Sequence, residues 1–168
     1  MPCVTQGTDY SCGAASLQAV LSYWGTDLPE SELMGRLHTS PHHGTHEEDI
    51  VRVAKELGFA ATMETGLTVR DLALSVQEGI PVIIVAQAWA EEQSGDFSWA
   101  DDWDHGHYMV VIGVDNDHVC LEDPALEECR EMLPIDDFEE RWHSILGVSP
   151  SAPDTVFVQH LGIFITRS

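Results

Sequence analysis

Positively charged side chains are scarce in this sequence. Only 7 of its 168 residues are lysine or arginine, against 29 aspartates and glutamates, so the formal net charge is −22 with neutral histidines. Such a surface repels the phosphates of DNA and RNA, and we therefore expect no nucleic-acid partner. The acidic excess favours a strongly hydrated surface, as in proteins adapted to high salt. Attraction of a basic peptide substrate is a second interpretation.

The sequence also lacks a long apolar segment. The longest apolar run, from Ile80 to Trp89, contains Pro81 and Gln87 and is too short to cross a bilayer. The first six residues have neither the basic region nor the apolar stretch of a signal peptide. We therefore expect no membrane span and a cytoplasmic location.

Closely spaced cysteine pairs are absent as well. The four cysteines, at positions 3, 12, 120 and 129, do not have the spacing of a zinc knuckle. In a cytoplasmic chain of this size we do not expect a disulfide framework. Cys3, Cys120 and Cys129 are interpreted as structural or incidental residues.

Apolar residues recur at helical spacing in the first half of the chain. The pattern predicts helices over residues 12–24, 29–37, 45–58 and 68–79. Thr45 with Glu48 has the spacing of a capping box, which would begin the third of these helices. Thr68 with Asp71 is predicted to begin the fourth.

The period changes in the second half. Strands are predicted over 82–86, 107–114, 118–122 and, as one or two strands, 155–166, with a short helix over 134–143. A polar, acidic, tryptophan-bearing loop precedes residue 105. This order predicts one α+β domain over 1–168. Its helical half, about 1–79, packs on an antiparallel sheet half, about 80–168, with the helices on one side.

Cys12 stands at the start of the first predicted helix. The unpaired backbone N–H groups and the positive end of the helix dipole stabilise a thiolate there. Gly13 keeps the approach to the sulfur open. Gln6 is placed to reach back and donate a hydrogen bond to an oxyanion, alongside the backbone N–H of Cys12. A buried structural cysteine is the alternative for this residue taken alone.

A thiolate nucleophile needs an acid–base partner, and His107 begins a rigid predicted strand. A hairpin that turns at residues 115–117 sets Met109 opposite Asp123, which places Asp123 and His107 on the same face as diagonal neighbours. Glu122 then points to the opposite face. His105, two residues before His107, is the competing candidate.

Three segments of the sequence form a recognisable set: Gln6-x-x-Asp9-Tyr10-x-Cys12-Gly13, Gly106-His107-Tyr108 and Asp123-Pro124. Together they resemble the bacteriocin-leader-processing, or double-glycine, cysteine peptidases, a branch of the papain-like superfamily. The resemblance implies a papain-like peptidase fold with Cys12 as nucleophile, His107 as general acid and base, Asp123 as its orienting carboxylate and Gln6 as oxyanion donor. It also implies a peptide or protein substrate, which includes leader peptides.

Two further groups of side chains each have two interpretations. His38, His42, His43 and His46 cluster in sequence, but their spacing favours a solvated loop, and we expect no metal and no cofactor. Trp89, Trp99 and Trp103 precede His107; they either line a substrate cleft or pack the acidic loop onto the domain.

The expected function is therefore cleavage of a peptide or amide bond through a thioester on Cys12. Two alternatives remain: acyl transfer to an amine or thiol, as in phytochelatin-synthase-like relatives, and a non-catalytic peptide-binding module. The sequence does not determine the oligomeric state.

Overall fold

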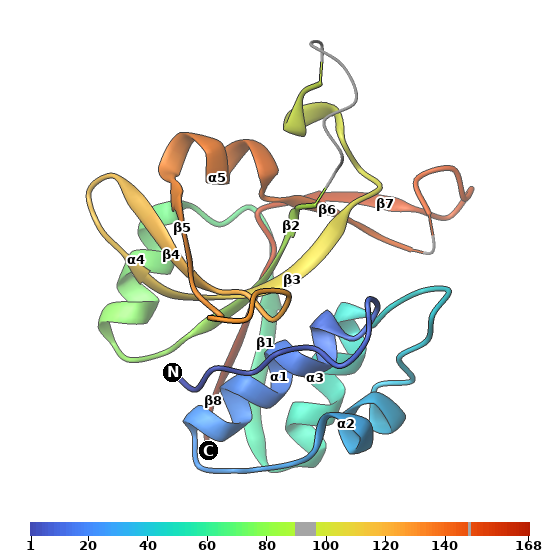
Figure 1. The fold of residues 1–168 in the computed structure, drawn as a ribbon, viewed down its shortest axis with the longest axis vertical. Coiled ribbons are helices and arrows are strands. Elements are labelled where there is room, and N and C mark those ends of the chain that lie inside the picture. Colours follow the sequence, from blue (N-terminus) through green and yellow to red (C-terminus); the bar gives the residue numbers. More distant parts are fainter. Residues whose placement is uncertain (90–96, 148) are drawn as a thin grey trace.

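The structure, a computed structural model, describes residues 1–89, 97–147 and 149–168 (Figure 1). Within these ranges the helices are α1 (Cys12–Tyr23), α2 (Glu30–Arg36), α3 (Glu47–Glu56), α4 (Val69–Gln77), the 3-10 turn η1 (Trp99–Asp101) and α5 (Ile135–Arg141). The strands are β1 (Phe59–Glu64), β2 (Val82–Gln87), β3 (Gly106–Val114), β4 (His118–Glu122), β5 (Glu131–Pro134), β6 (His143–Leu146), β7 (Val156–Gln159) and β8 (Gly162–Arg167). No helix in the described ranges has the length and apolar content needed to cross a membrane.

Six strands form one sheet in the order β1-β8-β2-β3-β4-β5, and each paired neighbour runs antiparallel. β6 and β7 form a separate two-stranded ribbon. The predicted α+β class with an antiparallel sheet is confirmed. β1 was not expected, because its residues lie between two predicted helices. It pairs with β8, so the sheet includes a strand from the half predicted to be helical.

Helices cover both faces of the sheet, whereas the sequence predicted helices on one side. Leu17 of α1 and Ile50 of α3 share one buried cluster with Ile83 of β2. Leu72 of α4 and Phe138 of α5 form the other cluster with the alternate residues of β2. All six residues of β2 are buried. The first five residues of β2 are apolar, and such a strand needs cover on both faces; α4 and α5 provide the second layer.

The two predicted capping boxes have different outcomes. At the start of α4, Thr68 accepts from the backbone N–H of Asp71 and the Asp71 carboxylate accepts from that of Thr68, so this capping box is confirmed. The prediction for Thr45 is wrong. His46 is the N-cap of α3, and the Thr45 hydroxyl instead bonds to that of Thr39, at 2.7 Å.

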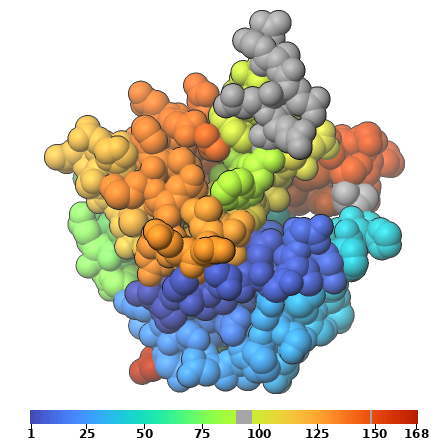
Figure 2. All heavy atoms as spheres, in the orientation of Figure 1, coloured from blue at the N-terminus to red at the C-terminus, as the bar shows by residue number. Residues whose placement is uncertain are grey.

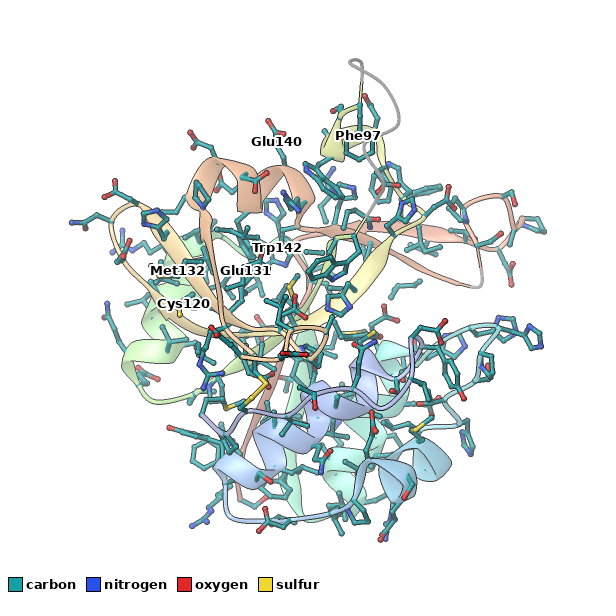
Figure 3. All side chains as sticks on the ribbon, viewed as in Figure 1. Phe97, Cys120, Glu131, Met132, Glu140 and Trp142 are labelled. Carbon is teal, nitrogen blue, oxygen red and sulfur yellow. A yellow bond between two sulfur atoms is a disulfide. The ribbon has the colours of Figure 1, made fainter. Side chains whose placement is uncertain are left out.

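A disulfide joins Cys3 to Cys129, which corrects the expectation that the cysteines of this chain form no disulfide framework (Figure 3). The two are 126 positions apart in sequence, so no local spacing could reveal the pair. The fold places the N-terminal segment along the loop that follows β4, where the two Cα atoms are 5.3 Å apart. Cys12 and Cys120 remain free thiols.

Candidate active site

Cys12 is the first residue of α1, as predicted. The preceding turn is closed by Ser11, whose hydroxyl accepts from the backbone N–H of Thr8 and donates to its carbonyl, at 3.0 and 3.1 Å. Ala15 makes the first bond of the helix, to the carbonyl of Ser11. The N–H groups of Cys12 and Gly13 therefore have no carbonyl partner within the helix. This is the environment in which a thiolate and a developing oxyanion are stabilised.

Three elements meet at Gly13, beside the cysteine. A Cβ atom at this position would lie 2.7 Å from the Cβ of Thr45 and 3.1 Å from Cδ2 of Tyr108. The Tyr108 hydroxyl in turn donates to the carbonyl of Thr45, at 2.8 Å. Glycine at position 13 thus allows the start of α1 to pack directly against β3 and the segment that leads into α3.

His107 and Asp123 lie together, as predicted from the expected pairing of their two strands. Nε2 of His107 is 2.7 Å from Oδ1 of Asp123. Oδ1 also accepts the backbone N–H of Ala125, at 2.8 Å. The strand register pairs Val110 with Glu122, the same alignment that sets residue 109 opposite 123. His107 is 6% exposed and Asp123 is fully buried, so the pair is shielded from water.

The electrostatics of this pair favour a protonated imidazole. Burial by itself would lower the pKa of His107, but hydrogen bonds and Coulomb attraction to Asp123 and Cys12 outweigh it and raise the pKa to about 9. Because Nε2 is bound to Asp123, Nδ1 is the ring nitrogen left for the sulfur of Cys12. The geometry can therefore hold an imidazolium beside Cys12 at neutral pH.

His105 does not compete for this position. Its Nδ1 lies 2.9 and 2.8 Å from the two carboxylate oxygens of Asp102, and its side chain is almost half exposed. Its backbone N–H donates to Oε1 of Gln87, while Nε2 of Gln87 donates to the carbonyl of His143. Gln87 is completely buried and was not identified from the sequence. A single amide at the end of an apolar strand was the available signal.

Gln6 connects the turn before Cys12 to the loop after Asp123. Its backbone N–H donates to the carbonyl of Pro124, at 2.8 Å. The side-chain Nε2 donates to the carbonyl of Thr8, at 2.8 Å, which leaves one of its two hydrogens for another acceptor. Oε1 is buried without a hydrogen-bond partner among the described residues. In Figure 2 the dark blue N-terminal segment lies against the orange surface that follows β4.

Cys12 lines a cleft of about 280 Å³, whose walls include Trp103, Tyr108 and Glu47. The three tryptophans have separate places. The ring of Trp89 meets that of His107 edge-on, with centroids 6.4 Å apart. Cζ of Arg141 lies 3.9 Å from the centroid of the Trp99 ring, so Trp99 packs the loop onto the domain. Trp103 lines the cleft, and the two interpretations therefore apply to different tryptophans. Residues 90–96 of the predicted acidic loop lie outside the described residues.

Three of the four clustered histidines lie at this cleft. His42, His43 and His46 line it. His38 lies 3.8 Å from a carboxylate oxygen of Asp49. In the parts of the chain that the structure describes, no three histidines, cysteines or acidic side chains are arranged to hold a metal ion.

The sequence matches the model of one known protein family and is similar to several of its relatives. The model of the Peptidase_C39 like family matches residues 1–150. The "Transport/processing ATP-binding protein ComA" of Streptococcus pneumoniae is 29% identical over 143 residues. The match covers 85% of this chain but 18% of that protein, so the chain spans about a fifth of the relative's length.

Several solved structures share the fold, and two of them are peptidases of stated type. The peptidase domain of Streptococcus ComA has a TM-score of 0.67 at 20% identity, and the match covers 98% of this chain and 97% of that one. A double glycine motif protease in complex with its leader peptide also has a TM-score of 0.67, at 18% identity, over 99% of this chain and 91% of that one. At these identities the likeness shows the fold.

Proposed function

The chain belongs to the Peptidase_C39 like family, and on that premise we propose that it is a cysteine peptidase with Cys12 as its nucleophile. The observation that carries the proposal is the buried contact of 2.7 Å between His107 and Asp123, next to a cysteine at a helix start. Asp123 orients the ring and stabilises its positive charge, and His107 exchanges protons with the substrate.

The proposed reaction has two stages. The Cys12 thiolate attacks the peptide carbonyl carbon, and the negative charge that develops on the carbonyl oxygen is held by the Cys12 backbone N–H. The imidazolium of His107 then gives its proton to the leaving amine as the C–N bond breaks, which leaves a thioester. In the second stage His107 takes a proton from water, the resulting hydroxide attacks the thioester, and the acid product and the thiolate are released.

Gln6 is proposed as the second oxyanion donor. Its Nε2 has one hydrogen not used by Thr8, and its backbone is fixed between the loop after Asp123 and the turn before Cys12. A side-chain rotation that directs this hydrogen into the cleft would complete the pair of donors. Removal of one such donor typically lowers kcat by about two to three orders of magnitude in other hydrolases.

The proposed substrate is a peptide or protein, with leader peptides as the leading class because a double glycine motif protease of this fold binds one. The proposed reaction uses protein groups and water alone. The cytoplasmic location expected from the sequence stays a prediction. The Cys3–Cys129 disulfide argues against it, because disulfides persist mainly in oxidising compartments.

Cleavage of a precursor peptide that contains a double-glycine leader tests the proposal. We expect the wild-type protein to release two fragments, detected by mass spectrometry, and Cys12→Ala to lower the rate at least about a thousandfold. In water enriched in ¹⁸O, hydrolysis places one heavy oxygen in the acid product. Transfer to an added amine instead would show an acyltransferase. Binding without any cleavage, or equal cleavage by Cys12→Ala, would contradict a cysteine peptidase.

A further inference from the structure

The cleft that contains Cys12 is walled by acidic side chains. Its lining contains Asp9, Glu47 and Asp104 together with His42, His43 and His46. A second cavity of about 430 Å³ shares Glu47 with it and adds Glu48, Asp49 and Asp154. None of the seven basic residues lines either cavity; they are Arg36, Arg52, Lys55, Arg70, Arg130, Arg141 and Arg167.

Glu47 differs from the other carboxylates of the cleft because it is buried. It is 6% exposed, whereas Asp9 and Asp104 are exposed. Asp49, its neighbour on α3, already has a cation, Nη2 of Arg52 at 2.6 Å. No lysine or arginine pairs with Glu47 among the residues that the structure describes. A buried carboxylate without a compensating cation is unfavourable, and an incoming ammonium or guanidinium would offset part of that cost.

The surroundings of Glu47 fix its position relative to the nucleophile. Thr45, two residues earlier, contacts Gly13 and accepts the hydrogen bond of Tyr108. The start of α3 is thereby held against the start of α1. Burial raises the pKa of Glu47, opposed by its own backbone N–H, by the Tyr108 hydroxyl and by the adjacent His46.

We propose that this cleft selects peptides with a lysine or arginine side chain close to the cleaved bond, and that Glu47 is the buried anion that receives it. The inference rests on the proposed function, since it names the substrate class of the same site. It also gives a local role to part of the acidic excess of the chain: Asp9 and Asp104 attract the cation, and Glu47 pairs with it out of water.

The local charge can be measured without any turnover. At pH 8, Cys12 is modified by two methanethiosulfonate reagents of similar size, one with an aminoethyl cation and one with a sulfonatoethyl anion. We expect the cationic reagent to react faster, and Glu47→Gln to lower the cation-to-anion rate ratio about tenfold. Glu56→Gln is the matched control. It makes the same change on the same helix outside both cavities and should leave the ratio unchanged.

A second measurement reads the preference itself. Bacterial peptides made by cleavage after glutamate, which retain internal lysine and arginine, are incubated with the protein and the new ends are mapped by mass spectrometry. Basic residues should be enriched near the cut by about tenfold or more for the wild type and lose that enrichment in Glu47→Gln. Asp104→Asn, at an exposed position of the same cleft, should also lower the cation-to-anion rate ratio. This variant tests the charge of the cleft even if the Glu47→Gln protein folds poorly.

The outcomes separate the two proposals. If no peptide is cut, the peptidase assignment fails and the reagent ratio alone decides the charge assignment. If peptides are cut without a basic preference, or if Glu47→Gln and Glu56→Gln change the ratio equally, Glu47 is not the cation-binding residue.

Discussion

The two oxygens of the Asp123 carboxylate have different environments. Oδ1 accepts from both His107 and Ala125, whereas Oδ2 is buried without a hydrogen-bond partner among the described residues. The backbone bond to Ala125 holds the carboxylate in place, and the negative charge favours the imidazolium of His107. A neutral amide at position 123 could keep the first effect and would lose the second.

Asp123→Asn should therefore move the alkaline limb of the pH–rate profile. In the wild type the imidazolium persists up to its raised pKa of about 9, so activity should fall above that pH. Without the carboxylate the limb should shift by about one unit or more to lower pH, and the rate at pH 8 should drop about twofold or more. Asp102→Asn, which removes the carboxylate beside His105, is the control and should leave the limb in place.

The same pair should affect stability, with a definite sign. A histidine whose folded pKa lies above its unfolded value stabilises the protein fully below the unfolded pKa, about 6.5, and loses that effect as pH rises through about 9. The stability difference between wild type and Asp123→Asn should therefore shrink across that interval in urea titrations. If Asp123→Asn changes neither the alkaline limb nor the pH dependence of stability, another carboxylate stabilises the imidazolium of His107.

At the scale of elements, the N-terminal segment is tied to β4 and to the loop after it. The backbone N–H of Val4 donates to Oε1 of Glu122, at 3.0 Å, and Arg130 donates to the carbonyl of Met1, at 2.7 Å. Burial raises the pKa of Glu122 to about 7, against the hydrogen bond from Val4. The disulfide Cys3–Cys129 closes the same junction covalently.

Reduction of this disulfide should destabilise the protein substantially. It closes a loop of more than a hundred residues, and native disulfides of this kind contribute typically about 2–5 kcal/mol. We expect the urea midpoint to fall on addition of a reductant, and Cys3→Ser with Cys129→Ser to reproduce the fall. Cys120→Ser, which removes a free thiol, should keep the dependence on reductant. Equal midpoints with and without reductant in the wild type would mean that the two thiols are not joined.

Local elements were predictable where the signal lies in neighbouring residues. The helices at 12–24 and 29–37, the capping box at Thr68 and the hairpin of β3 and β4 all follow from adjacent side chains. β1 was missed because its partner, β8, lies about a hundred positions away and pairing decides its conformation. Thr45 was misassigned because its hydroxyl bonds to Thr39 rather than to the helix start.

At the scale of the whole molecule, the sequence predicted the class of fold and the proximity of His107 and Asp123. It did not predict the residues that surround this pair. Next to the turn Val114 pairs with Val119, one residue away from the predicted register, and a β-bulge between Val111 and Gly113 restores the alignment that places the proposed catalytic pair. The disulfide, the buried Gln87 and the buried Glu47 depend on contacts between distant segments. The proposed role of Gln6 needs a different side-chain conformation, since its amide donates to the carbonyl of Thr8 in this structure.

The net charge of −22 is also a property of the whole chain. Composition alone allows two interpretations of it. Hydration of the surface and attraction of a basic substrate both follow from it. The structure adds a location, because the described lining of the Cys12 cleft contains acidic residues and no lysine or arginine. Charge at the cleft bears on substrate choice, and charge elsewhere bears on solubility.

The central claim is that Cys12 and His107 form a reactive pair, and selective alkylation tests it most directly. Two free thiols are present, at Cys12 and Cys120, but only Cys12 lies beside an imidazole at a helix start. A limiting amount of iodoacetamide at neutral pH should give one adduct by intact mass, located on Cys12 by peptide mapping. His107→Ala should slow that adduct about tenfold or more, and His105→Ala should leave it unchanged. Equal labelling of Cys12 and Cys120, or no effect of His107→Ala, would contradict the assignment.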